Sequence, residues 1–387
     1  MYQFVYDHPV KVLFGPGQLG ELHKQNLPGK KALLATSNGT SVKRCGYLDS
    51  VQKELELAGV SYELFDEIRA NPTAVNVMDG AARMRETGCD FILALGGGSV
   101  MDCAKCIALM AANSGDIWDY SSSEKGGGQT PEHPALPIVC ITTSSGTASE
   151  VDRGAVISND ALQEKTLISH PSFLPAISVV DPNLTVSVPP VYTAYQGMDA
   201  FFHASETVLS KLCHPMAEMF ALKSIELVSR YLPRAVRDGS DMEAREMMAY
   251  ASSFAGYYML CTSGHRIEHV VGSFHEDLPH GAGLIMTAHA YYDFLAEKKA
   301  AEDRMILMAR AMGREQAASG KDFVEALDEL IAAVGCADLK MSDWGIMREE
   351  LALYPPKIHK VLGGNIAAEP IFISDEEYLT IYENAYR

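Results

Sequence analysis

The residues best suited to chemistry are histidines and carboxylates in the second half of the chain. Asp199 and His203 lie four positions apart, and His265 and His269 share this spacing. In a helix, this spacing places both side chains of a pair on one face. His280 follows within PHG, a sequence typical of a turn or a helix start. One carboxylate and three imidazoles that leave a position open would suit a divalent metal such as Zn²⁺ or Fe²⁺. A single pair occurs by chance on surface helices, but two pairs with His280 favour the metal interpretation.

A second candidate site begins where the apolar run Phe91–Leu95 meets the segment Gly96–Ser99. The glycines are expected to adopt left-handed backbone angles and to let a ligand approach closely. The amide groups at the start of the next helix favour an anion. This turn therefore predicts a phosphate-binding site, with a turn that needs glycine only for packing as the alternative. Asp102, one turn into the helix, could orient a ribose or simply favour the helix N-terminus.

Two further features nearby carry weaker signals. The turn Thr142–Glu150 is rich in hydroxyl groups and could line the same crevice, or it could be an ordinary Ser/Thr-rich loop. Cys103 and Cys106 form a CxxC, which can serve redox chemistry or zinc. Apolar residues at helical spacing surround them and no second CxxC exists, so a buried helix is the favoured interpretation. All eight cysteines are expected to be reduced thiols.

The elements that must position these residues differ between the two halves of the chain. In the first half, amphipathic helical patterns such as 50–58 and 73–87 alternate with short apolar runs. These runs are expected to be strands, at 31–36, 91–95, 138–143 and 177–181. Such alternation predicts an α/β domain with a mainly parallel sheet. From about Pro189 strand-like runs disappear, and helical patterns follow at 191–297 and 300–334. We expect a dinucleotide-binding domain over 1–186 and an all-helical, metal-binding domain over 187–387.

Composition excludes several classes of partner. The 387 residues include 32 Lys and Arg against 50 Asp and Glu, a formal net charge of −18. This balance argues against sequence-independent binding to nucleic acid or to an anionic membrane. No apolar run reaches the roughly 18–20 residues of a membrane-spanning helix. The start of the chain lacks the pattern of a signal peptide, so a cytoplasmic location is expected.

Several ordered motifs make the chain resemble the iron-containing, or group III, alcohol dehydrogenase family, in its aldehyde reductase or butanol dehydrogenase-like branch. The resemblance covers almost the whole chain. The motifs are LFGPGQLGEL (Leu13–Leu22), LALGGGSVMDCAK (Leu93–Lys105), TTSSGTASEV (Thr142–Val151), DPNLT (Asp181–Thr185), GMDAFFHASE (Gly197–Glu206) and HRIEHVVGSFHEDLPHG (His265–Gly281).

The resemblance implies an α/β cofactor domain, a helical domain and an active site between them. The implied metal ligands are Asp199, His203, His265 and His280. His269 lies beside the metal near the nicotinamide and is the candidate catalytic residue. The implied cofactor contacts are Gly97, Gly98, Ser99, Thr142, Thr143, Ser144 and Lys165.

The sequence departs from the family pattern in two places. Ala148 stands where the family commonly has a glycine. The stretch from His269 to His280 is one residue longer than expected, which puts the aim of His280 in doubt and makes His275 a substitute candidate for the metal.

The residues after the second strand bear on the choice of cofactor. An acidic side chain at this place bonds the ribose 2′-hydroxyl in NAD-preferring folds. Here the sequence is Ser37, Asn38, Gly39, Thr40 and Ser41, none of them acidic. Lys43 and Arg44 follow and could meet a 2′-phosphate, or they could be solvated. NADP(H) is therefore expected to be preferred over NAD(H).

Together these features predict a metal-dependent alcohol dehydrogenase that works as an NAD(P)H-linked aldehyde reductase on small alcohols and aldehydes. A glycerol dehydrogenase-like enzyme, a 3-dehydroquinate synthase-like enzyme and a non-catalytic binding protein with the same fold remain alternatives. An edge strand at 11–14 predicts a homodimer or a higher homo-oligomer, because exposed sheet edges tend to be paired.

Overall fold

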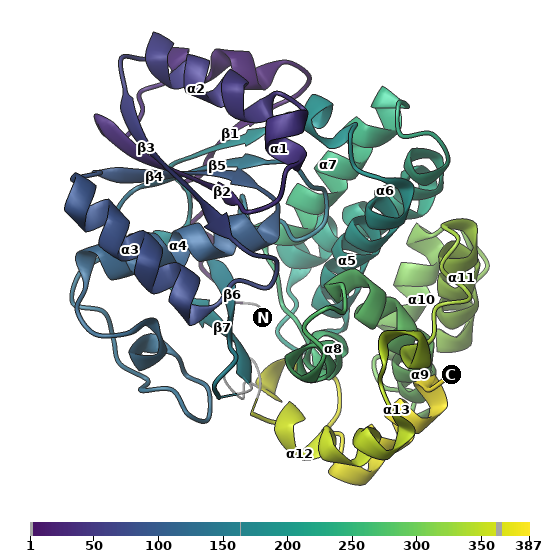
Figure 1. Cartoon of the computed structure of the whole chain (residues 1–387). Helices are drawn as coiled ribbons and strands as arrows, with labels where there is room; N and C mark the ends of the chain where they lie inside the picture. The colour runs from purple at the N-terminus through teal and green to yellow at the C-terminus, as the bar shows by residue number, and fades with distance from the viewer. Residues whose placement is uncertain (1–2, 163, 361–365) are drawn as a thin grey trace. The chain divides into compact units, whose positions relative to one another are not determined.

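The computed structural model describes residues 3–162, 164–360 and 366–387 of the chain (Figure 1). The chain divides into two compact units, Met1–Ser187 and Val188–Arg387. The first unit carries a parallel sheet between helices, and helices make up the second.

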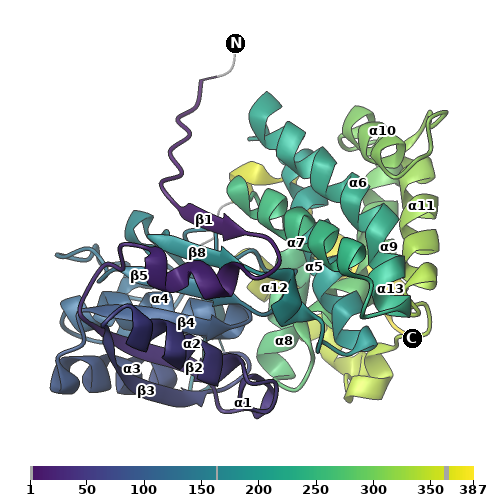
Figure 2. The ribbon, with the colours of Figure 1, turned by 90° about the horizontal axis from the view of Figure 1, so that it is seen from above.

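The first unit is built on a six-stranded sheet in the order β1-β8-β5-β4-β2-β3, and every neighbouring pair is parallel. Figure 2 shows β1 beside β8, where β1 forms one edge. The strands are β1 (Lys11–Phe14), β2 (Lys31–Ser37), β3 (Ser61–Ile68), β4 (Phe91–Gly96), β5 (Ile138–Thr142) and β8 (Ile177–Val180). The expected parallel α/β arrangement is confirmed.

Helices cover both faces of this sheet because its strands are apolar on both sides. In β2, Ala32 and Leu34 belong to the core under α2 (Tyr47–Leu57), together with Val51. Leu33 and Ala35 point the other way, into the core under α3 (Ala74–Thr87) and α4 (Gly98–Ala112). The sheet thus lies between two helical layers (Figure 1). Its carboxyl strand ends carry the glycine-rich and hydroxyl-rich turns.

The sequence analysis did not predict two parts of this unit. The edge strand β3 was not foreseen, nor was the antiparallel hairpin β6 (Gly154–Asn159) and β7 (Glu164–Ser169). Helix α2 begins at Tyr47, earlier than the expected 50, because Gly46 in a left-handed conformation precedes it. The strand expected at 138–143 ends at Thr142.

The second unit contains no strand among its described residues. Its helices are α5 (Pro190–Leu209), α6 (Pro215–Arg237), α7 (Met242–Tyr257), α8 (Ser263–Phe274), α9 (His280–Glu297), α10 (Glu302–Ala311), α11 (Gly320–Ala333), α12 (Pro355–Ile358) and α13 (Asp375–Ala385). They share one apolar core, to which Phe201 of α5 and Tyr291 of α9 contribute. In the described part of the chain, no helix combines the length and apolar character needed to cross a membrane.

Candidate functional site

Three helices bring one carboxylate and three imidazoles together in the second unit. Asp199 and His203 lie on one face of α5, His265 is in α8, and His280 is the first residue of α9. Asp199 Oδ1 lies 3.6 Å from His203 Nδ1, 3.5 Å from His265 Nε2 and 3.5 Å from His280 Nε2. The carboxylate oxygen is therefore the centre on which all three rings converge.

The spacing of these donors fits a divalent cation better than direct hydrogen bonds. Asp199 Oδ1, His203 Nδ1 and His265 Nε2 are buried and make no hydrogen bond to any described residue. Metal–nitrogen and metal–oxygen bonds of about 2.0–2.2 Å in a tetrahedral site separate ligand atoms by about 3.3–3.6 Å. Buried polar atoms without partners are costly. A cation bound among these atoms would satisfy all of them.

Two further carboxylates contact the Nδ1 atoms of His265 and His280. Glu206 Oε1 accepts a hydrogen bond from His265 Nδ1 at 2.6 Å, and Glu268 Oε2 accepts one from His280 Nδ1. Both glutamates are fully buried. When each ring is neutral, this hydrogen bond keeps the proton on Nδ1 and leaves the lone pair of Nε2 toward Asp199. This is the tautomer that binds a metal.

Charge balance also favours a cation here. Burial opposes ionisation of Asp199, but His203, His265 and His280 outweigh it and hold its pKa well below the usual range. Burial also disfavours charge on the imidazoles. It lowers the pKa of His203 to about 4, whereas Glu206 keeps the pKa of His265 well above its ordinary value.

The pKa of His280 shifts in the same direction as that of His265. Burial disfavours its charged form, but Glu268 and Asp199 outweigh this and raise its pKa. When no cation is bound, these shifts favour protonation of His265 and His280 beside the three buried carboxylates. A divalent cation supplies the same two positive charges when it displaces those protons.

Glycines let the helices approach closely enough to place these carboxylates. A Cβ on Gly264 would lie 2.5 Å from Glu206 Oε1, and a Cβ on Gly283 would lie 2.7 Å from Glu268 Cγ. A Cβ on Gly281 would lie 2.3 Å from the carbonyl oxygen of Tyr195 in α5. Side chains at these positions would push apart the elements that hold His265 and His280.

The two remaining histidines of the motif have different surroundings. His269 is buried, and its ring centroid lies 5.3 Å from that of His280 and 6.2 Å from that of His265. His275 ends α8 and its Nε2 lies 2.8 Å from Glu350 Oε2. Although the stretch from His269 to His280 is one residue longer than expected, the His280 ring still faces Asp199. His275 lies in none of the potential metal-binding groups among the described residues.

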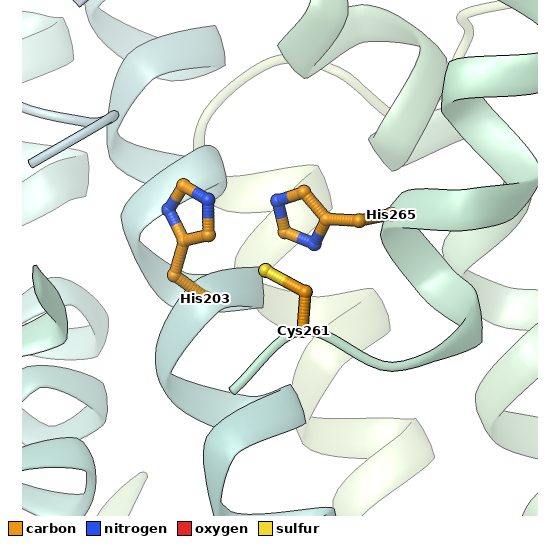
Figure 3. Close-up of side chains that lie close together, drawn as sticks. All are labelled: His203, Cys261 and His265. Carbon is orange, nitrogen blue, oxygen red and sulfur yellow. The ribbon is translucent and has the colours of Figure 1, made fainter. Parts of the chain in front are cut away.

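Cys261, which the sequence analysis did not single out, lies beside two of these histidines. Its Sγ and the ligand atoms of His203 and His265 all lie within 4.8 Å of one another. Figure 3 shows the sulfur near the edges of the two rings. Glu206 and Glu268 were also missed. The sequence signal for Glu206 was its helical spacing from Asp199 and His203, and Glu268 stands inside HRIEH.

The glycine turn of the first unit leads from β4 into α4 as predicted. Gly97 is the N-cap of α4 and, having no side chain, gives the first amide groups of the helix no side-chain cap. The expected left-handed angles are wrong, because none of Gly96, Gly97 and Gly98 has a positive φ. Glycine is required by contacts instead. A Cβ on Gly98 would lie 2.5 Å from Thr147 Cγ2, and one on Gly96 would lie 2.6 Å from Val100 Cγ2.

The hydroxyl-rich turn lies against this glycine turn. A Cβ on Gly97 would lie 3.3 Å from Ser144 Oγ, which is buried and makes no hydrogen bond to any described residue. Thr142 ends β5, and its hydroxyl donates to the carbonyl of Ser144. The amide of Thr143 donates to Gly96. The uncapped amides of α4 and the Ser144 hydroxyl fit a phosphate group.

Ala148 has φ +56°, a conformation that favours glycine. The family's usual glycine at this position therefore has a backbone reason. The alanine retains the left-handed turn at a cost of about 1–2 kcal/mol.

Two other residues predicted to bind the cofactor, Asp102 and Lys165, contact neighbouring segments of the first unit. Asp102 accepts hydrogen bonds from Ser149 Oγ at 2.6 Å and from the Val156 amide at 2.8 Å, so both of its oxygens join α4 to neighbouring segments. Burial raises the pKa of Asp102 to about 6. Lys165 is buried in β7, where it pairs in register with Ser158 of β6.

The loop after β2 holds the remaining candidates. Ser37 ends β2, the Asn38 amide donates to the carbonyl of Ile68, and Ser41 begins the short helix α1 (Ser41–Arg44). Gly39 is exposed and its nearest neighbour is Ser37 Oγ at 3.4 Å from an added Cβ. Lys43 Nζ lies 2.5 Å from Asp66 Oδ2. Of the two basic residues Lys43 and Arg44, Lys43 is thus paired with Asp66.

Comparison with known proteins agrees with both halves of this arrangement. Residues 9–182 match the family described as iron-containing alcohol dehydrogenase, and residues 193–386 match the C-terminal domain of the Fe-containing alcohol dehydrogenase family. The chain is 34% identical to a 1,3-propanediol dehydrogenase of Klebsiella pneumoniae over 99% of both chains.

Other relatives extend this likeness. A probable NADH-dependent butanol dehydrogenase of Bacillus subtilis is 30% identical over 91% of this chain and 92% of its own length. The solved structure of an archaeal halo-thermophilic alcohol dehydrogenase from a Red Sea brine pool superposes with a TM-score of 0.93 at 31% identity, over 100% of this chain and 99% of the other. Both halves match along their length, so the chain belongs to the iron-containing alcohol dehydrogenase family.

Proposed function

We propose that this protein is a metal-dependent alcohol dehydrogenase that works as an aldehyde reductase, with hydride moving between NAD(P)H and a small aldehyde or primary alcohol. The observation that carries the proposal is the convergence of three imidazole nitrogens on Asp199 Oδ1 at 3.5–3.6 Å in a buried site. Membership of the family supports a metal, iron in its name, and a nicotinamide cofactor.

The residues proposed to hold the metal are Asp199, His203, His265 and His280. When bound there, the cation supplies Lewis-acid chemistry that polarises the oxygen of the substrate. Glu206 and Glu268 keep the protons of His265 and His280 on Nδ1 and thereby aim both Nε2 atoms. His269, whose ring adjoins those of His265 and His280, is proposed to relay a proton to or from the substrate oxygen through a ring nitrogen.

The cofactor is proposed to bind along the carboxyl ends of β2, β4 and β5. The pyrophosphate is assigned to the uncapped start of α4, where Gly97, Gly98 and Ser99 offer backbone amides. Other proposed contacts come from Ser37, Asn38, Gly39, Ser41, Asp102, Thr142, Thr143, Ser144 and Lys165. The close approach of Ser144 Oγ to Gly97 supports the phosphate position.

The metal assignment is tested by comparing two histidine variants. His265→Ala should lose metal and turnover together, because a ligand atom is removed. His269→Ala should retain metal while its kcat falls by a factor on the order of 10²–10⁴, the usual contribution of a positioned proton donor or acceptor. Metal content by elemental analysis and NAD(P)H oxidation with an aldehyde panel provide the readouts. Full metal occupancy with normal turnover in His265→Ala would overturn the assignment.

We further propose a preference for NADP(H). No acidic residue lies in the stretch from Ser37 to Ser41, and Gly39 leaves room for a 2′-phosphate. Ser37 and Ser41 can donate hydrogen bonds to it, and Arg44 can add a charge. Lys43 already pairs with Asp66. A charge-assisted hydrogen bond is worth about 1.5–3 kcal/mol, enough for a tenfold preference.

The test is kcat/KM for NADPH and NADH with one aldehyde. NADPH should be favoured at least tenfold, and Gly39→Asp should shift selectivity toward NADH. Equal values or a preference for NADH in the unmodified enzyme would reject the proposal. If NADPH is preferred but Gly39→Asp shifts nothing, the ribose lies elsewhere.

A homodimer or a higher homo-oligomer and a cytoplasmic location are also proposed. Strand β1 is an edge strand whose only neighbour among the described strands is β8, so its other side is available for pairing. Sedimentation that shows only a 42.1 kDa species at micromolar concentration would contradict the oligomer.

A further inference from the structure

Cys261 gives the metal centre a second, overlapping set of donors. Its Sγ and the ligand atoms of His203 and His265 lie within 4.8 Å of one another. Cys261 precedes α8, whereas the two histidines come from α5 and α8. Figure 3 shows the two rings facing each other, with the sulfur near their edges. Within the described residues, no other cysteine belongs to such a group.

The two imidazoles of this set lie face to face in the buried part of the site. Their rings stack with centroids 4.3 Å apart and an interplanar angle of 17°. His203 and His265 are more than nine-tenths buried, and His203 Nδ1 and His265 Nε2 make no hydrogen bond to any described residue. Glu206 holds Nδ1 of His265, which leaves Nε2 as the atom for a cation. These two nitrogens also lie 3.6 Å and 3.5 Å from Asp199 Oδ1, so the set with Cys261 draws on imidazoles that also face the set with Asp199.

We propose that His203, Cys261 and His265 form an alternative site that takes a soft divalent cation such as Zn²⁺ or Cd²⁺ through the Cys261 thiolate. This inference rests on the proposed function, because His203 and His265 are also proposed ligands of the catalytic metal. Thiolate sulfur selects soft and borderline metals, whereas Asp199 with imidazoles accepts harder ones such as Fe²⁺. Binding displaces the thiol proton to solvent.

The proposed catalytic set and the set with Cys261 cannot be filled at the same time because both use His203 and His265. The set with Asp199 and His280 has a carboxylate oxygen, and the set with Cys261 has a sulfur in its place. Tetrahedral bonds of about 2.3 Å to sulfur and 2.0–2.1 Å to nitrogen separate the sulfur from each nitrogen by about 3.5–3.6 Å and the two nitrogens by about 3.3–3.4 Å. A small closure of the three side chains reaches this spacing. Soft metals are therefore expected to compete with iron for the same two histidines.

The test is the optical spectrum of the whole protein loaded with Co²⁺. A thiolate ligand produces an intense sulfur-to-cobalt charge-transfer band in the near ultraviolet, which oxygen and nitrogen ligands do not produce. The unmodified protein should show this band, and Cys261→Ser should lose it. Cys45→Ser is the matched control, since Cys45 is also partly exposed but lies in the first unit. Its spectrum should equal that of the unmodified protein.

Competitive titration supplies the second measurement. The ratio of Zn²⁺ affinity to Fe²⁺ affinity should fall at least tenfold in Cys261→Ser and stay constant in Cys45→Ser. Asp199→Ala should keep the charge-transfer band while losing iron and turnover. If the band is absent and the ratio is unchanged while iron binds and the enzyme turns over, this inference fails alone. If the band is present but iron does not bind, the proposed function fails alone.

Discussion

The carboxylates that contact the metal-binding imidazoles determine how tightly these imidazoles can bind a metal. Glu206 and Glu268 are fully buried, and each accepts the Nδ1 proton of one histidine. A buried carboxylate also raises the basicity of the imidazole that it contacts, which strengthens the bond at Nε2. Their burial is tolerated because each has a charged or polar partner close by. Metal affinity is thus a property of histidine and glutamate pairs.

Glu268→Gln should weaken metal binding without abolishing it. The amide oxygen of glutamine can still accept the proton of His280 Nδ1, but the negative charge is lost. Loss of such a partner costs about 10–100-fold in metal affinity. Glu350→Gln is the matched control, because Glu350 bonds His275 outside the metal cluster. Competition with a chelator provides the dissociation constants. Equal metal affinity in Glu268→Gln and the control would contradict the positioning role.

At the scale of single residues, the sequence predicted the residues whose type and spacing indicate a metal site. It missed Cys261, Glu206 and Glu268, whose roles depend on where the fold buries them. Helical spacing paired Asp199 with His203 and His265 with His269, and the resemblance to the family added His280 to the expected ligands. Cys261 lies outside any helical repeat with His203, so only the fold brings the two together. The glycine turn was identified correctly, but its reason is close packing rather than positive φ.

At the scale of elements, glycines set how closely α5, α8 and α9 pack. Gly281 follows His280 in the first turn of α9 and faces the backbone of Tyr195 in α5. Backbone cannot move aside as a flexible side chain can. The position of His280 relative to Asp199 therefore depends on a residue that carries no chemistry of its own.

Gly281→Ala should lower stability and metal affinity together. Its Cβ would lie 2.3 Å from the Tyr195 carbonyl oxygen, so α9 must shift. Overpacking of this kind costs about 1–3 kcal/mol in free energy of unfolding. Gly20→Ala is the control, because nothing lies within 4 Å of a Cβ added there. Denaturant unfolding and chelator competition measure both effects. Retained stability and affinity in Gly281→Ala would show that the helices are not held at this contact.

Apart from the edge strand β1, the strands that the sequence predicted are buried on both faces, and the strands that it missed are not. The strands β2, β4, β5 and β8 read as apolar runs because helices cover them on each side. Strand β3 carries Glu63, Asp66 and Glu67 and forms a sheet edge, where polar side chains reach solvent. Its sequence therefore resembles a loop more than a buried strand. The hairpin β6–β7 is also half buried.

Across the whole molecule, the two sets of proposed binding residues are separated by unit. All four proposed metal ligands lie in Val188–Arg387, and the proposed cofactor residues lie in Met1–Ser187. A ligand that binds only the folded state stabilises the elements that hold it, by about 4 kcal/mol at a thousandfold excess over its dissociation constant. Each ligand should therefore protect a different group of elements against local opening.

Removal of the metal should raise amide hydrogen exchange in α5, α8 and α9, because these helices carry the ligand side chains and their three buried carboxylates lose a compensating cation. The start of α4 should change much less, since Gly97 and Ser144 belong to the first unit. Addition of NADPH should produce the complementary pattern, with protection of the start of α4 and of the loop after β2. Hydrogen–deuterium exchange with mass spectrometry, with and without chelator, measures both effects on the same peptides. Exchange that rises equally in α4 and α5 on chelation would contradict the separate placement of the two ligands.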